Sequence, residues 1–239
     1  MARAARLKII QQIERARKSR VISFVTSTRQ GLEVQMAMDT VRYVYDHLER
    51  IASTNEGEPI NIDLFLHSNG GDGTVPWRLV TLIREFANQF SVLVPYRAFS
   101  AATLTALGAD AIVMHPMGML GPTDATVANA FNPIDPRNQQ PIGISVEDVT
   151  AYLSLIKEDA KIQHEDQLVT AFNLLADKVH PLALGNVKRH ISQSRTMARK
   201  LLGLHMDPDD HAHRVSNIVE NLTSKSFFHG HPINRKEAR

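Results

Sequence analysis

Two stretches of this sequence decide its fold: Ile60–Gly73, which reads INIDLFLHSNGGDG, and Ser91–His115, which reads SVLVPYRAFSAATLTALGADAIVMH. Each begins with a mostly apolar run that is typical of a buried strand and then reaches glycines or small residues. A further apolar run, Asp110–His115, closes the second stretch. Because such runs alternate with segments of helical pattern, the sequence predicts a parallel sheet covered by helices on both faces.

Upstream of these strands, the pattern predicts one further strand and one helix. Val21–Thr26 is rich in β-branched residues, and Leu32–Ile51 repeats apolar residues at the spacing of one helix face. Val34 and Met38 belong to that repeat, so we expect them to lie on the packed face of the helix. Together the two segments predict the first strand and helix of the sheet domain.

The C-terminal part of the chain is predicted to be helical. Ser145–Asp148 resembles a capping box, with Asp148 in the place of the usual glutamate, and opens a helix that reaches about Lys161. Further helices are expected over residues 166–179, 183–202 and 207–225. Between the sheet and these helices, Ala125–Gly143 is a polar loop punctuated by prolines, of a length that is usually functional or disordered.

Composition and charge narrow the class of protein. The chain has 239 residues, 43% of them hydrophobic, which argues against disorder. Its 27 Lys and Arg residues nearly balance 25 Asp and Glu residues, which argues against a nucleic-acid-binding protein with a dominant basic face. The absence of cysteine excludes a disulfide-stapled scaffold, a thiolate zinc site and a cysteine nucleophile.

Residues 1–20 form a basic segment with seven Arg and Lys side chains against one Glu. Leu7, Ile10 and Ile13 recur there at near-helical spacing, so the segment predicts a basic amphipathic helix. Such a helix can contact an anionic membrane surface or RNA, or it can pack its apolar stripe on a neighbouring subunit. The balanced charge of the whole chain favours a protein that binds no nucleic acid.

We divide the rest of the chain into a core over residues 21–143 and a helical C-terminal region of the same domain over residues 144–239. The N-terminal residues lack the apolar stretch of a signal peptide, and no run of about 18 apolar residues occurs. A cytoplasmic protein is therefore expected.

Two turns are candidates for chemistry, because both follow strands at the edge where parallel sheets build sites. The paired Gly70 and Gly71 can direct N–H groups at one anionic oxygen, as an oxyanion hole requires. Ser100 stands at a strand-to-helix junction among small residues, where its hydroxyl can serve as a nucleophile. The alternatives are a plain turn for the glycines and a helix N-cap for the serine.

Four motifs occur in order: a strand ending in HSNGG at His67–Gly71, AFSAAT at Ala98–Thr103, ADAIVM at Ala109–Met114 and LGPTD at Leu120–Asp124. Together they resemble the serine dehydrogenase proteinase family, which is signal-peptide-peptidase-like and belongs to the ClpP/crotonase superfamily. The tail, Leu222–Arg239, resembles the closing segment of that family. The resemblance implies an α/β fold with a repeated β-β-α parallel-sheet core and added N- and C-terminal helices.

The resemblance implies a serine endopeptidase of the Ser-Lys type that cleaves peptide or protein substrates through an acyl-enzyme on Ser100. Gly70, Gly71 and the N–H of Ala101 resemble the oxyanion hole of the family. Because relatives build their active chamber from rings of subunits, a homo-oligomer is expected. The family resemblance calls for no cofactor and no metal.

The general base is less clear. The position that aligns with the Clp-type histidine falls near Thr123, and His115 lies about eight residues too early. The Ser-Lys relatives place a lysine after the serine, and Lys157 is the first lysine after Ser100, with Lys161 one turn later. A lysine acts as a base only where its pKa is lowered towards neutrality, so a solvated helix lysine is the alternative for Lys157.

Two other functions stay open. One is an oligomeric, non-catalytic peptide-binding scaffold of the same fold, and the other is a crotonase-like acyl-CoA enzyme, for which no acidic pair or adenine pocket can be assigned. The sequence predicts no zinc site at its two histidine pairs. His211 and His213 lie two apart on a predicted helix and so point to different sides, and no acidic residue lies beside His229 and His231.

Overall fold

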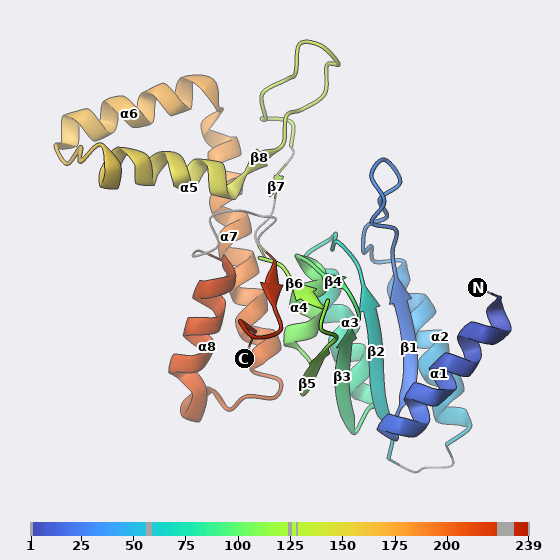
Figure 1. Cartoon of the computed structure of the whole chain (residues 1–239). Coiled ribbons are helices and arrows are strands. Elements are labelled where there is room, and N and C mark those ends of the chain that lie inside the picture. The colour runs from blue at the N-terminus through green and yellow to red at the C-terminus, as the bar shows by residue number, and fades with distance from the viewer. Residues whose placement is uncertain (1, 56–58, 124–125, 128, 224–231, 239) are drawn as a thin grey trace.

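The apolar runs form a four-stranded parallel sheet in the order β1-β2-β3-β5, beside a smaller sheet in the order β4-β6-β9 (Figure 1). The structure, a computed structural model, describes residues 2–55, 59–123, 126–127, 129–223 and 232–238. The strands are β1 (Arg20–Val25), β2 (Asn61–His67), β3 (Gln89–Val94), β4 (Arg97–Ala98), β5 (Ala111–Met114), β6 (Met119–Leu120), β7 (Thr126–Val127), β8 (Ile144–Ser145) and β9 (Ile233–Asn234). The helices are α1 (Arg3–Arg17), α2 (Thr40–Ser53), α3 (Val75–Phe86), α4 (Ala101–Leu107), α5 (Val146–Ser154), the π-helical η1 (Leu155–Asp159), α6 (Glu165–Lys178), α7 (Pro181–Leu202) and α8 (Pro208–Thr223).

Helices α2 and α3 cover one face of the four-stranded sheet. Val44 and Leu48 of α2 and Val80 of α3 are buried in the same cluster as Leu64 and Leu66 of β2. Strand β2 is half-buried or buried along its whole length, as the mostly apolar run predicts for a central parallel strand. The predicted parallel sheet is therefore confirmed.

The short helix α4 is enclosed by its neighbours, and all seven of its residues are buried. It packs against α3 and α7. Gly108, which follows the helix, lies so close to both that a Cβ there would come within 2.7 Å of Val80 and 3.0 Å of Leu201. The turn that precedes α4 is thus attached to a rigid element.

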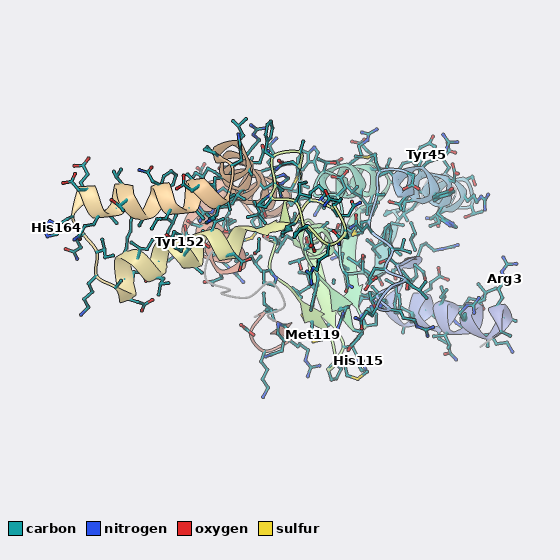
Figure 2. All side chains as sticks on the ribbon, turned by 90° about the horizontal axis from the view of Figure 1, so that it is seen from above. Arg3, Tyr45, His115, Met119, Tyr152 and His164 are labelled. Carbon is teal, nitrogen blue, oxygen red and sulfur yellow. The ribbon has the colours of Figure 1, made fainter. Side chains whose placement is uncertain are left out.

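Helices α5 and α6, with η1 between them, form an arm (residues 146–178) that projects from the rest of the molecule in both views (Figures 1 and 2). A small apolar cluster lies at its base and joins Ile144 of β8 to Ala183 and Val187 of α7. Helix α6 has no buried residue. Within the part of the chain that the structure describes, the outer part of the arm therefore stays largely exposed.

The helix predicted over Leu32–Ile51 is wrong in its first half, because residues 27–39 form a loop. Met36 of this loop is fully buried and lies beside Gly71 in a parallel bridge. In place of helical hydrogen bonds, the backbone of Met36 bonds to Gly70 and Asp72, about 35 positions later in the chain. A periodic pattern of apolar residues contains no information about such distant partners. Two residues predicted on the packed helix face are instead exposed, namely Val34 and Met38.

Helix α1 is attached to the sheet through a buried carboxylate. Asp63 of β2 is 2% exposed and points away from the face to which Leu64 contributes, because successive strand residues alternate. It accepts hydrogen bonds from both the Nε and Nη2 atoms of Arg17 and, at 2.6 Å, from Ser19 Oγ. The hydrogen bond to Asp63 raises the pKa of Arg17. Among the described residues, no helix combines the length and apolar composition needed to cross a bilayer.

Replacing Arg17 with methionine is expected to lower the free energy of unfolding by about 3 kcal/mol, because the buried Asp63 carboxylate then has no cation. The double variant Arg17→Met with Asp63→Asn should recover part of that loss. Urea denaturation measures both. As a control, Arg42→Met removes an exposed pair with Asp46 and should change stability by less than about 0.5 kcal/mol. An equally small loss for Arg17→Met would contradict the anchoring role.

Candidate active site

The two turns that the sequence singles out lie side by side at the carboxyl ends of the parallel strands. The Phe99 N–H donates to the carbonyl of Ser68 at 3.0 Å, and the Ser68 N–H donates to the carbonyl of Arg97 at 3.1 Å. The Thr26 N–H, at the end of β1, donates to the carbonyl of His67 at 2.9 Å. These backbone bonds join the glycine turn after β2 to the serine turn before α4.

Ser100 has an unusual backbone conformation, with φ 52° and ψ −117°. A positive φ is costly for a residue with a Cβ and persists only where the surroundings enforce it, which is common at active sites. The Ser100 side chain does not cap α4, and its hydroxyl has no hydrogen-bond partner among the described residues. The geometry thus differs from that of an ordinary N-cap serine, whose side-chain oxygen accepts from the helix.

Thr103 holds the serine turn from inside the helix. Its fully buried hydroxyl lies 2.7 Å from the carbonyl of Ala98 and 2.8 Å from that of Gly121, and it accepts from the Gly121 N–H at 3.1 Å. Gly121 itself packs against the ring of Phe99, where a Cβ would come within 2.8 Å. Both sides of Ser100 are therefore fixed by buried contacts.

Gly70 lies against the backbone of the serine turn. It has φ 96°, and a Cβ at this position would lie 2.6 Å from Phe99 O and 2.9 Å from Ala101 N. The Gly70 N–H donates to Ser68 Oγ at 3.0 Å, and Ser68 Oγ accepts a second bond from Thr26 Oγ1 at 2.8 Å. The Gly70 N–H is therefore hydrogen-bonded within the protein. The lack of a side chain at Gly70 lets the two turns approach closely.

Gly71 is held by the loop that precedes α2. The Met36 N–H donates to the Gly70 carbonyl at 2.8 Å, and the Met36 carbonyl accepts from the Asp72 N–H at 2.9 Å. This parallel pairing uses the Gly70 carbonyl and the Asp72 N–H, which flank Gly71. The Gly71 N–H is therefore directed to the opposite edge of the segment. Neither this N–H nor that of Ala101 has a hydrogen-bond partner among the described residues. The site thus holds two N–H donors with unused hydrogen-bonding capacity.

His67 lies beside these turns, at the end of β2. Its ring stacks on Tyr96 with the centroids 5.9 Å apart, and Nε2 lies 3.4 Å from Thr28 Oγ1. Burial and, secondly, the charge of Arg97 lower the pKa of the imidazole. The neutral form of His67 is therefore favoured.

The predicted base candidates lie elsewhere in the chain. Lys157 is exposed on η1 of the arm, between Tyr152 and His164, which Figure 2 shows far from the sheet. The exposed Lys161 follows on the same arm. The structure does not bring Lys157 to the Ser100 turn within one chain.

The two positions considered for a histidine base have other contacts. Thr123 is buried, and its N–H donates to the carbonyl of Leu222 at 3.0 Å. Nδ1 of His115 accepts from the Met117 N–H at 3.2 Å in the turn after β5. Of the histidines considered for zinc, His229 and His231 lie outside the described residues.

Sequence reasoning missed the residues that hold the two turns. Ser68 and Thr103 carry a weak signal, since each hydroxyl stands next to or near a predicted functional residue in the chain. Thr26 and Met36 carry none, because their contacts depend on strand pairing between distant segments.

A model of the ClpP-like SDH-type serine proteinases matches residues 1–198. The chain belongs to this family. Membership agrees with the parallel sheet and with the two joined turns described above, and it confirms the resemblance stated from the sequence motifs.

Two relatives of this family member occur in Methanocaldococcus jannaschii. The uncharacterized protein MJ1495 is 30% identical over 179 residues, a match that covers 72% of this chain and 59% of that protein. The uncharacterized protein MJ0137 is 29% identical over 245 residues, covering 97% of this chain and 81% of that protein. The match to MJ1495 thus spans less than two thirds of the relative's length.

Two of the similar solved structures are those of proteases. One is a membrane-bound stomatin-specific protease, 1510-N, at 18% identity and a TM-score of 0.37, with 63% of this chain and 66% of that chain covered. Another is the ClpP protease catalytic domain from Plasmodium falciparum, at 11% identity and a TM-score of 0.31, with 42% of this chain and 49% of that chain covered.

Replacing Gly70 with alanine is expected to destabilise the protein by about 1–3 kcal/mol, because the added methyl group meets Phe99 O at a positive φ. Thermal unfolding measures the effect. Gly73→Ala is the matched control, since nothing lies within 4 Å of its Cβ position. Equal behaviour of the two variants would contradict the proposed close packing.

The lowered pKa of His67 predicts a pH dependence of stability. Because the unfolded state binds the proton more readily than the folded state, stability should fall as the pH drops below about 6.5. In His67→Gln this part of the decline should disappear, as measured by urea denaturation between roughly pH 5 and 7.5. His47→Gln, at an exposed position on α2, is the control. A decline identical in His67→Gln and the wild type would rule out His67 as its source.

Proposed function

We propose that this chain is a serine peptidase in which Ser100 attacks the carbonyl carbon of a peptide bond. The observation that carries the proposal is the strained Ser100 backbone at a turn packed directly on Gly70. Membership of a serine proteinase family supports the reaction class. Peptide and protein substrates follow from that class.

In the proposed reaction, the Ser100 hydroxyl loses its proton to a base as Oγ bonds to the peptide carbonyl carbon. The negative charge on the carbonyl oxygen is stabilised by the N–H groups of Gly71 and Ala101, with Gly70 shaping the turn. Collapse of the tetrahedral intermediate breaks the C–N bond, releases the amine after protonation and leaves an acyl-enzyme. Water then hydrolyses the ester and restores Ser100.

We expect the active form to be a homo-oligomer, because the single chain exposes apolar side chains on two separate surfaces. On the arm, Val169 and Phe172 of α6 are about half exposed. On the sheet, Val25 of β1 is 60% exposed on the face opposite the buried Phe24, although parallel sheets are generally covered on both faces. A second copy of the chain is the proposed partner that covers these surfaces.

Assembly would also supply the general base that the single chain does not place at Ser100. Because the arm of the same chain projects away from α4 (Figure 1), we propose that the Lys157 ammonium reaches Ser100 from the arm of a neighbouring copy. Leu153 and Ile156 border the same groove as Lys157, so apolar side chains already lie beside its ammonium group. Glu165 also borders this groove and is an alternative partner for the ammonium group until the arm docks.

Replacing Ser100 with alanine is expected to abolish covalent labelling by fluorophosphonate probes, because the probe reacts only with an activated hydroxyl. The oligomer should stay intact, since the Ser100 hydroxyl has no hydrogen-bond partner among the described residues. Ser192→Ala, on the exposed face of α7, is the control and should label like the wild type. Undiminished labelling of Ser100→Ala would disprove the assignment.

A mixing experiment tests the base. Ser100→Ala and Lys157→Ala are each expected to lack casein hydrolysis, whereas oligomers refolded from an equal mixture should regain about a quarter of the wild-type rate if neighbours share each site. Light scattering should give a mass that is a multiple of 26.7 kDa. No recovery in mixed oligomers would contradict a shared dyad, and a concentration-independent mass of 26.7 kDa would contradict assembly.

The non-catalytic peptide-binding scaffold is the second candidate. It is favoured by one observation, namely that the Ser100 hydroxyl has no partner among the described residues of the single chain. Absence of fluorophosphonate labelling in the assembled wild type, together with retained peptide binding, would favour it over the peptidase.

A further inference from the structure

Arg97 is a cation beside the candidate active site that has no carboxylate partner among the described residues. It lies in β4, three residues before Ser100, and its carbonyl accepts a hydrogen bond from the Ser68 N–H. The ion pairs between described residues use other arginines, which are Arg17, Arg20, Arg42, Arg84 and Arg137. The charge of Arg97 is therefore unmatched within the described part of the chain.

The guanidinium of Arg97 lies over two aromatic rings. Its Cζ lies 5.2 Å from the ring centroid of Tyr96 and 5.2 Å from that of Phe99. Nη1 donates to Asn69 Oδ1 at 3.2 Å, while Nε is buried without a hydrogen-bond partner. Since a guanidinium has five N–H donors, most of its hydrogen-bonding capacity is unused by these contacts.

The residues that hold this guanidinium belong to the two turns of the site. Phe99 immediately precedes Ser100, and Asn69 immediately precedes Gly70, whose backbone contact joins the turns. The neighbouring His67 ring adds no second positive charge at neutral pH, since burial and the guanidinium lower its pKa. A cation held by contacts with both turns thus lies next to the Ser100 turn.

We propose that Arg97 binds a carboxylate of the peptide substrate, close to the bond that Ser100 attacks. A half-buried cation is costly unless an anion pairs with it, and the planar fork of a guanidinium matches the two oxygens of a carboxylate. The inference rests on the proposed peptidase function and specifies its substrate class. A C-terminal carboxylate and an Asp or Glu side chain present the same group, so the experiment must separate these two sources.

The test uses a mixture of octapeptides, each of which is apolar except for a single Glu or Gln. Across the mixture, that residue occupies every position in turn. Every peptide is made with a free and with an amidated C terminus, and cleavage is followed by mass spectrometry. For the wild type we expect the carboxylate form to be preferred roughly 10- to 100-fold in kcat/KM at one position, the range expected from hydrogen bonds to a charged group. Preference for Glu over Gln identifies the side chain, and preference for the free acid over the amide identifies the terminus.

Arg97→Gln is expected to lose this preference, mainly through KM, and Arg97→Lys to keep part of it. Arg78→Gln is the matched control, because it removes the same charge from an exposed position on α3 and should keep the wild-type preference. Thermal unfolding verifies that each variant is folded. A wild type that cleaves without carboxylate preference, or the same preference in Arg97→Gln, would overturn the proposal.

A binding experiment separates this proposal from the peptidase function. The same peptides are selected on immobilised Ser100→Ala and on Ser100→Ala combined with Arg97→Gln. Enrichment of carboxylate peptides on the first variant alone supports the Arg97 site even if the wild type neither labels nor cleaves, an outcome that refutes only the peptidase. Equal selection on both variants refutes the Arg97 site even if the wild type cleaves peptides.

Discussion

The site depends on one close approach, in which the backbone of Gly70 lies against that of the Phe99–Ala101 turn. Any side chain at Gly70 would come within 2.6 Å of a carbonyl oxygen there, so two strand ends meet backbone to backbone. Ser68 and Met36 fix the glycine side of this contact, and Thr103 fixes the serine side. The positions of the unused N–H groups follow from these bonds, which means that the donors are in place before any ligand arrives.

The local parts of this arrangement could be predicted from sequence. The apolar run of β2, the paired glycines after it and the serine among small residues are short-range signals, and the structure brings the two turns together. The loop containing Met36 could not be predicted, because its hydrogen bonds join residues that are far apart in the chain, whereas periodicity reports only on local neighbours. Arg97 carried no signal either, since the rings that enclose it become neighbours of its guanidinium only in the folded turn.

The direction of the arm is a second point that sequence could not supply. The helical pattern predicts α6 well, but at the base of the arm Ile144 packs with Ala183 and Val187 of α7, which lie about 40 positions later in the chain and which the helical pattern of α6 does not reveal. In the single chain, the preformed N–H donors and the lysine on the arm are therefore separate. Under the proposed function, an isolated chain has the groups that stabilise charge but lacks the group that accepts the proton, so association and activity coincide.

The loop over residues 27–39 has a practical consequence for work on this protein. Its tip at Gly31 has a positive φ and open space around it, while Met36, five residues on, is fully buried against the glycine turn. Loop tips of this kind tolerate insertions. A change of register at Met36, by contrast, would disrupt its backbone hydrogen bonds to Gly70 and Asp72. A fluorophore attached at Gly31 would thus sit in solvent on a segment whose far end is hydrogen-bonded to the glycine turn, and would report optically on that turn without contacting it.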